Sequence, residues 1–178
     1  MVTVSPSGST TTAVTYTPIA TNTLSSSATS VTFSSIAGTY KDLVLICNVQ
    51  RIGTAENPSL TLQFNSDTGN NYSMTHILGN GTTASSSRNN TQNMMNLSYF
   101  SMPSADSFAP YIINIMNYAN ATTYKSVVSR GGAAGSGTQA TVGLWRSTAA
   151  ITSVTITNDG SPYGMSTGST FTLYGIGA

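Results

Sequence analysis

Charged residues are scarce in this chain. Lys and Arg number 6 and Asp and Glu number 5 among 178 residues, so 6% of the chain is charged and the formal net charge is +1. An average soluble domain is about 25% charged. Helical bundles depend on Glu, Lys and Arg, and nucleic-acid-binding proteins depend on clustered cations. The composition therefore excludes both classes, and we expect no nucleic-acid partner.

Cysteine and long apolar runs are lacking as well. Cys47 is the only cysteine, so no disulfide can form within the chain. No run of about 18 apolar residues occurs, so we expect no insertion into a membrane. The first residues have neither the basic nor the apolar region of a signal peptide. The composition is typical of an extracellular protein, yet no export signal is seen. We therefore expect a protein that is assembled in the cytoplasm of a host cell and released by lysis, as the components of a virus particle are.

The side chains that catalysis requires are few and scattered. His76 is the only histidine, and it shares one face of an expected strand with Met74 and Leu78, which is typical of a core residue. No nucleophile motif accompanies it. The five acidic residues are dispersed, so no carboxylate pair for glycoside hydrolysis is expected. The sequence predicts no enzymatic activity, no catalytic residue and no cofactor.

Residues 65–71 resemble a calcium loop built from oxygen ligands, with Asp67 as the candidate ligand. The segment has one carboxylate among several amides and lacks the terminal Glu of an EF-hand. We favour a turn instead, in which Gly69 takes a positive φ and Asn or Asp side chains bind the local backbone. The expectation is therefore no metal site, with Asp67 as a weak calcium candidate.

The sequence is rich in hydroxyl residues, and its apolar residues alternate with polar ones. Ser and Thr make up roughly a third of the chain, far above ordinary usage. Apolar residues alternate with polar ones along many short segments, which is typical of β-strands. The expected strands are residues 13–17, 30–33, 42–50, 59–64, 72–78, 94–100, 111–118, 124–129, 139–146, 153–158 and 170–176. The segment 42–50 is apolar on both faces, so we expect it to be central and buried.

These strands predict an all-β protein, an antiparallel β-sandwich of jelly-roll type with an extended N-terminal arm. The arm covers residues 1–23 and the sandwich domain residues 24–178. Residues 13–17 of the arm are expected to add a strand to a neighbour. Polar or glycine-rich loops are predicted at 79–93, 130–137 and 158–168.

Aromatic residues offer the best candidates for ligand binding. Tyr numbers nine and Trp one, and aromatic rings beside amide and hydroxyl groups suit the recognition of sugars. The first candidates are Tyr163, Trp145, Tyr72 and Tyr99. The alternative is that these rings belong to the core or to cross-strand pairs, which is usual for aromatic residues on strands. Tyr163 lies in a predicted loop, so for this residue both interpretations stay open.

Four segments occur in an order that resembles a group of small structural proteins of tailed-bacteriophage virions. They are Ser34–Leu45 (SSIAGTYKDLVL), Leu62–Tyr72 (LQFNSDTGNNY), Tyr118–Val127 (YANATTYKSV) and Phe171–Ile176 (FTLYGI). The resemblance begins near residue 24. It implies a β-sandwich in the tail, in a fibre or as a capsid decoration, oligomeric and exposed on a particle, with no catalytic residues carried over.

Two hypotheses follow. The first is a non-enzymatic virion structural protein, a homo-oligomer, for example a trimer, that contacts other virion proteins and is anchored by its arm. The second is a carbohydrate-binding, lectin-like module that serves in host attachment and takes a host-surface glycan as its partner. A hydrolytic enzyme ranks third.

Overall fold

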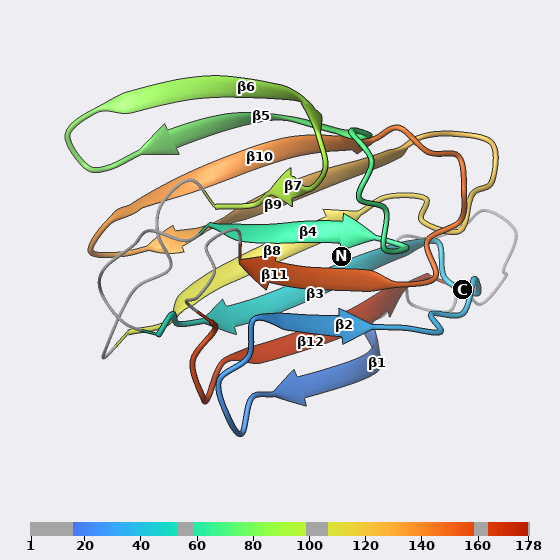
Figure 1. The fold of residues 1–178 in the computed structure, drawn as a ribbon, viewed down its shortest axis with the longest axis horizontal. Coiled ribbons are helices and arrows are strands. Elements are labelled where there is room, and N and C mark those ends of the chain that lie inside the picture. The colour runs from blue at the N-terminus through green and yellow to red at the C-terminus, as the bar shows by residue number, and fades with distance from the viewer. Residues whose placement is uncertain (1–15, 53–58, 99–106, 159–163, 178) are drawn as a thin grey trace, which may run out of the picture.

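All the regular structure is β-strand in the parts of the chain that the computed structural model describes, residues 16–52, 59–98, 107–158 and 164–177. No helix that could cross a membrane is found among these residues. The twelve strands (Figure 1) are β1 (Tyr16–Thr23), β2 (Ser30–Phe33), β3 (Asp42–Val49), β4 (Leu60–Phe64), β5 (Tyr72–Gly79), β6 (Ala84–Gln92), β7 (Met95–Asn96), β8 (Ala109–Ile115), β9 (Lys125–Ala133), β10 (Gly137–Trp145), β11 (Val154–Asn158) and β12 (Thr170–Ile176).

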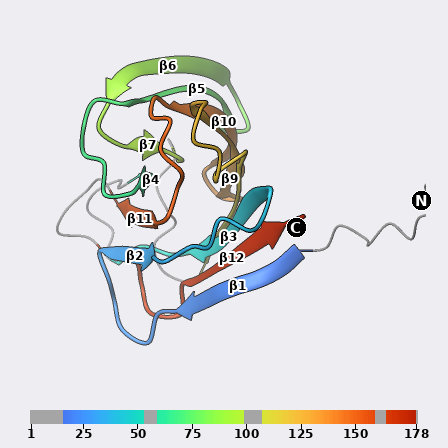
Figure 2. The same cartoon turned by 90° about the vertical axis from the view of Figure 1, so that its right-hand side faces the viewer.

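The strands form two antiparallel sheets, which confirms the predicted all-β class. The large sheet has eight strands in the order β1-β12-β3-β8-β9-β10-β5-β6, and the small sheet has four in the order β2-β11-β4-β7. From β2 onward the chain alternates between the sheets, with one strand of the small sheet between successive strands or groups of strands of the large one. The large sheet curves around the small one (Figure 2).

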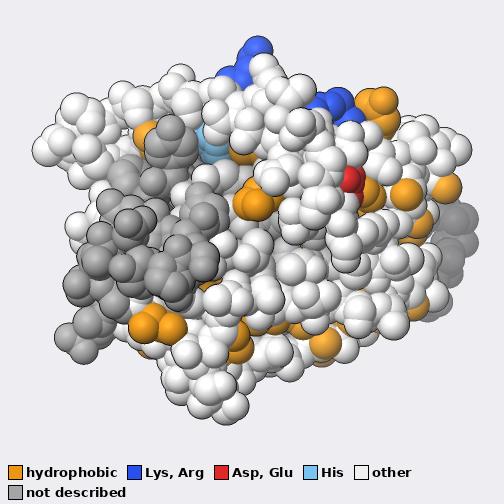
Figure 3. Space-filling view, in the orientation of Figure 1, with side chains coloured by type: hydrophobic (Ala, Val, Ile, Leu, Met, Phe, Trp, Pro, Cys, Tyr) orange, Lys and Arg blue, Asp and Glu red, His pale blue; other side chains and the backbone are white. Residues whose placement is uncertain are grey.

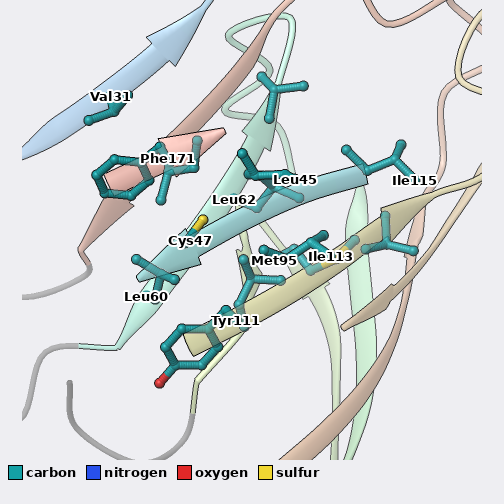
Figure 4. Packing of buried hydrophobic residues seen from close by; sticks show 14 of the residues in the cluster. Val31, Leu45, Cys47, Leu60, Leu62, Met95, Tyr111, Ile113, Ile115 and Phe171 are labelled. Carbon is teal, nitrogen blue, oxygen red and sulfur yellow. The ribbon is translucent and has the colours of Figure 1, made fainter. Parts of the chain in front are cut away.

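The core lies between the two sheets and is built by the alternation seen in the sequence. In β3, Leu43, Leu45, Cys47 and Val49 point inward and are fully buried. They face residues of β4 such as Leu62 across the interface (Figure 4). Each fully buried large aliphatic side chain contributes about 1.5–3 kcal/mol to folding. As predicted, β3 is central, since it pairs with β12 on one side and with β8 on the other.

Two predicted loops are wrong. The segment 79–93 contains β6, seven of whose nine residues pair with β5. Much of the glycine-rich segment 130–137 continues β9 and begins β10. Neither stretch has apolar alternation, because β6 is an edge strand that is largely exposed and the glycines carry no side chains to alternate. Backbone hydrogen bonds to a neighbouring strand hold both in place.

The expected arm is described only from Tyr16 onward. Residues 16–23 form β1, which pairs with β12 of the same chain at one edge of the large sheet. The bounds of β12 agree with those predicted. Residues 1–15, which include most of the strand predicted at 13–17, lie outside the described residues, as do Tyr99 and Tyr163.

Candidate functional site

The sole histidine is a core residue in the structure. His76 of β5 is fully buried, and its Nδ1 lies 2.8 Å from the Oγ1 of Thr141 on β10. Its burial lowers the pKa of the imidazole. A substrate in solution cannot reach this ring, so the site offers no access for general acid–base chemistry.

Two of the four aromatic candidates lie together in the core. Trp145 is 2% exposed and Tyr72 is fully buried. Their rings stack with centroids 6.4 Å apart, and Phe64 packs 5.4 Å from Trp145. Sugar binding by stacking needs a ring face that is open to solvent, and both of these rings are buried in the core. The lectin-like hypothesis therefore depends on Tyr99 and Tyr163, on which the structure does not bear.

The carboxylate of Asp67 holds the turn between β4 and β5. Its Oδ2 accepts hydrogen bonds from Trp145 Nε1 at 2.7 Å and Asn71 Nδ2 at 2.9 Å, and its Oδ1 accepts one from the Gly69 amide at 2.8 Å. Partial burial by itself raises the pKa of Asp67. The hydrogen bonds from Trp145, Asn71 and Gly69 outweigh burial and hold this pKa below its usual value.

The geometry of residues 65–71 is that of a turn whose side chains bind the protein itself. Both carboxylate oxygens of Asp67 face N–H donors, which a calcium ion would have to displace. In the part of the chain that the structure describes, no group of three or more His, Cys, Asp or Glu side chains could hold a metal. The sequence predicted a positive φ at Gly69, and this prediction is wrong. The positive φ values occur at Asn65 (51°) and Ser66 (56°).

The segments that carry the bacteriophage resemblance meet at one end of the sandwich, where β4, β8 and β12 end and β3 and β9 begin (Figure 1). The Tyr118 hydroxyl donates to the Ala37 carbonyl and accepts from the Tyr40 amide, which joins the third segment to the first. A Cβ added at Gly175 would collide with the Tyr40 ring, so the fourth segment packs directly against the first.

Asparagine side chains fix the loops at this same end. Asn65 Oδ1 accepts hydrogen bonds from the amides of Thr152 and Ser153, while its Nδ2 donates to the Ala150 carbonyl. These bonds connect the second segment to the chain just before β11. Asn65, like Tyr40 and Tyr118, therefore has an architectural role in this structure, because its side chain binds the backbone of a neighbouring loop.

Lys125 is buried at the start of β9 within the third segment. Its Nζ donates to the Thr123 carbonyl at 2.7 Å and to the Thr148 carbonyl at 3.2 Å. Burial lowers the pKa of this ammonium group. The carbonyl partners make it a link between two loops, so this cation is not available to bind a ligand on the surface.

The outer face of the large sheet is the surface that the sequence analysis did not single out. Val142 and Ile77 are 60% and 63% exposed, and Val128 lies directly opposite Val142 on β9. Farther across the sheet, Ile46 of β3 is exposed and lies opposite Ile112 of β8. These side chains lie on five strands of the side away from the core and form a band that polar residues interrupt, since Arg130 of β9 lies opposite Ile112.

Few charges accompany this band. Arg88 of β6 and Arg130 of β9 are exposed on the same face. A hollow of about 570 Å³ is lined by Arg130 and by glycines such as Gly79, Gly81 and Gly132, with no aromatic ring or carboxylate among its lining residues. Figure 3 shows the opposite side of the molecule, over the small sheet, where Lys, Arg and acidic side chains are visible only in a few small groups.

A signal for this face was present in the sequence at two positions. Val44 and Ile46 are apolar on the side of β3 opposite to Leu43 and Leu45, which indicated burial on both faces. In the structure Val44 is 3% exposed and Ile46 is 37% exposed. That the outward-facing apolar residues of β5 and β10 lie on neighbouring strands follows only from the strand order of the sheet.

Comparison of the chain with protein-family models, with curated proteins and with solved structures found no match.

Proposed function

We propose that this protein is a non-enzymatic structural component of a bacteriophage virion, an oligomeric β-sandwich in the tail, in a fibre or on the capsid surface. The observation that carries the proposal is the set of exposed apolar side chains on the outer face of the large sheet, among them Val142 and Ile77, which are about 60% exposed. Exposed apolar areas of this kind usually mark contacts with other proteins. A net charge of +1 adds little repulsion between neighbouring copies.

The interlocked end of the sandwich supports the same proposal. Three of the four segments that resemble bacteriophage structural proteins hold one another through Tyr118, Tyr40 and Gly175. Residues that serve only to hold loops together suit a rigid module in a particle. Such a module would meet its partners through its faces, its strand edges and the N-terminal arm.

The strand order supports a jelly roll as the finer fold class. In a jelly roll, eight strands alternate between two four-stranded sheets. Here the small sheet corresponds to one of these four-stranded sheets and consists of β2, β11, β4 and β7. The sheet that faces it contains β3, β5 and β6. The meander β8-β9-β10 occupies the place of one strand between β3 and β5, and β12 and β1 extend the edge. Jelly rolls are common in viral capsid proteins.

An antibody raised against the chain tests the proposal. Particles purified from lysates of cells that carry the gene are labelled with the antibody and gold and are viewed in negative stain. We expect label at a constant place on the particles. Unlabelled particles, with the protein left in the soluble fraction of the lysate, would overturn the assignment.

The anchoring role of the arm is tested separately. Deletion of residues 1–15 leaves β1 and its pairing with β12 in the chain. We expect an unchanged far-UV circular dichroism spectrum and loss of the protein from purified particles. Incorporation at the level of the full chain would refute the anchoring role.

A further inference from the structure

Strand β6 is an open edge of the large sheet. Seven of its nine residues pair with β5, and no other described strand lies on its second side. Arg88 is its one charged residue, and it contains no proline. An edge of this length and composition presents unpaired backbone groups to which another strand can add.

The register determines which backbone groups are free. The Asn80 amide donates to the Thr83 carbonyl at the turn, so this pair is hydrogen-bonded. Hydrogen-bonded pairs recur at every second residue of an antiparallel ladder. Residues 85, 87 and 89 therefore face β5, while the N–H and C=O groups of Ala84, Ser86 and Arg88 point away from the sheet.

The opposite edge of the sheet is protected and β6 is not. In β1, Pro18 has no N–H to donate, and the ladder is irregular between Pro18 and Ala20. Prolines and bulges are the usual devices that prevent pairing at an edge. On β6 the irregularity comes only after Asn89, where Thr91 has a φ of 56°. The edge is therefore regular from Ala84 to Arg88.

We propose that β6 pairs with β6 of a second copy of this chain, antiparallel and about a two-fold axis at Ser86. Ser86 then lies opposite Ser86 of the other copy, and Ala84 lies opposite Arg88 on either side. The three pairs supply six backbone hydrogen bonds and join the two large sheets into one. This register keeps the two Arg88 side chains four residues apart along the strands, which is about 14 Å.

Three features favour a second copy as the partner. Ala84, Ser86 and Arg88 are complementary to their own reversed order, with the small Ala84 opposite the long Arg88. The formal net charge of +1 causes little repulsion between copies. Pairing of like edges also closes as a two-fold dimer, whereas pairing of β6 with a different edge would give a ring or an open filament.

The contact is expected to be weak on its own. Five paired residues span roughly 17 Å, and such an edge buries less than the ~800 Å² per partner of a standard stable interface. The dimer should therefore form at high protein concentration, as in a particle. The inference rests on the proposed function in this respect, since it names the contact between copies that the assembly would use.

Cysteine cross-linking of the full-length protein tests both the pairing and its register. The variants are Ser86→Cys, Ala84→Cys and Arg88→Cys, oxidised under mild conditions; native Cys47 is fully buried and stays out of the reaction. Hydrogen-bonded antiparallel pairs have Cα atoms about 5.5 Å apart, within the range of a disulfide, and atoms more than about 7 Å apart cannot be bridged. Ser86→Cys should give disulfide-linked dimers by itself.

The other two variants supply the matched control for register. Ala84→Cys alone and Arg88→Cys alone should remain monomeric under the same conditions, and an equal mixture of the two should give the mixed dimer. No dimer from Ser86→Cys and none from the mixture would overturn the proposal. Dimers from Ala84→Cys alone, as efficient as those from Ser86→Cys, would also overturn it, because they would show non-specific collision.

Edge pairing is tested without cysteine by sedimentation from about 1 μM to about 1 mM protein, the range over which weak contacts dissociate. Ser86→Pro removes an outward N–H and should raise the dissociation constant at least tenfold, whereas Ser86→Thr keeps this N–H and should leave it unchanged. Equal association of both variants, with native circular dichroism, would refute the pairing. If β6 does not pair but the antibody labels the particles, the pairing is refuted and the virion assignment stands. If β6 pairs but the particles are unlabelled, the virion assignment is refuted and the pairing stands.

Discussion

The substitution Asp67→Asn tests how the turn between β4 and β5 is held. An Asn side chain has nearly the shape of Asp, but it presents one acceptor and one donor where the carboxylate presents two acceptors. Asp67 accepts from Trp145 and Asn71 on one oxygen and from Gly69 on the other. Whichever way the substituted amide turns, at least one of these donors loses its acceptor, and the remaining hydrogen bonds lose the help of the charge.

The size of the loss follows from these contacts. A hydrogen bond to a charged group is worth about 1.5–3 kcal/mol and a neutral one about 1 kcal/mol. Asp67 is partly exposed, so solvent weakens the contribution of its charge. The Trp145 side chain is 2% exposed, so its N–H finds no water if its acceptor is lost. Together these effects predict a decrease of about 2 kcal/mol in the free energy of unfolding.

Urea denaturation measures this decrease. Trp145 is the only tryptophan, so its fluorescence reports on the cluster itself, and circular dichroism reports on the sheets. For a chain of this size, 2 kcal/mol corresponds to a fall in Tm of about 4–8 °C. Asp42→Asn is the matched control: it removes the same charge, but the amide oxygen that it introduces can still accept from the Asn117 backbone N–H as Asp42 does. We expect less than about 0.5 kcal/mol there.

The pH dependence gives a second measurement of the same contacts. The folded-state pKa of Asp67 lies below the ordinary value of 3.8. The stabilisation is therefore complete above pH 3.8 and is lost as pH falls through the folded-state pKa. The difference between wild type and Asp67→Asn should shrink over this range. A difference below about 0.5 kcal/mol at neutral pH, or equal losses in Asp67→Asn and Asp42→Asn, would refute the reasoning.

Three further predictions concern the core and the outer face. Burial lowers the pKa of His76, so the unfolded state takes up a proton first and the free energy of unfolding should fall as pH drops below 6.5. In His76→Gln this free energy, measured by urea denaturation, should depend less on pH between about pH 6.5 and 5. An unchanged dependence on pH would contradict the prediction. Gly175→Ala places a methyl group on the Tyr40 ring and should cost about 1–3 kcal/mol, measured by thermal melting, where an unaltered Tm would be inconsistent with the packing. Val142 is 60% exposed, so Val142→Lys should change stability by less than about 0.5 kcal/mol and reduce incorporation into particles; full incorporation would show that the outer face is not a contact.

The strands with apolar alternation could be predicted from the sequence because each strand carries its own signal. β2, β3, β4, β5 and β12 were all expected within one or two residues of their observed bounds. In β3 the apolar residues on both faces correctly predicted a central strand, but burial of both faces was wrong, since Ile46 is 37% exposed. The signal is local, since side chains at every second residue must face the same core.

The candidate site could be predicted only in part. Asp67 was recognised in its turn, but its pairing with Trp145, 78 positions away, was not. The two residues meet because β5 and β10 are neighbours in the large sheet, with Trp145 opposite Tyr72. A spacing of this length leaves no periodicity in the sequence from which the contact could be inferred.

The sequence by itself determined the all-β fold class and the chemistry of the surface, because composition and alternation are properties of the chain in any arrangement. A chain with 6% charged residues must meet water and partners through hydroxyls, amides and apolar side chains. Only the tertiary structure decided that β6 is a strand, that its outer groups are Ala84, Ser86 and Arg88, and that Trp145 is buried. The physical reason is that edges, faces and burial depend on which strands become neighbours, and that choice is made by contacts between residues far apart in the sequence.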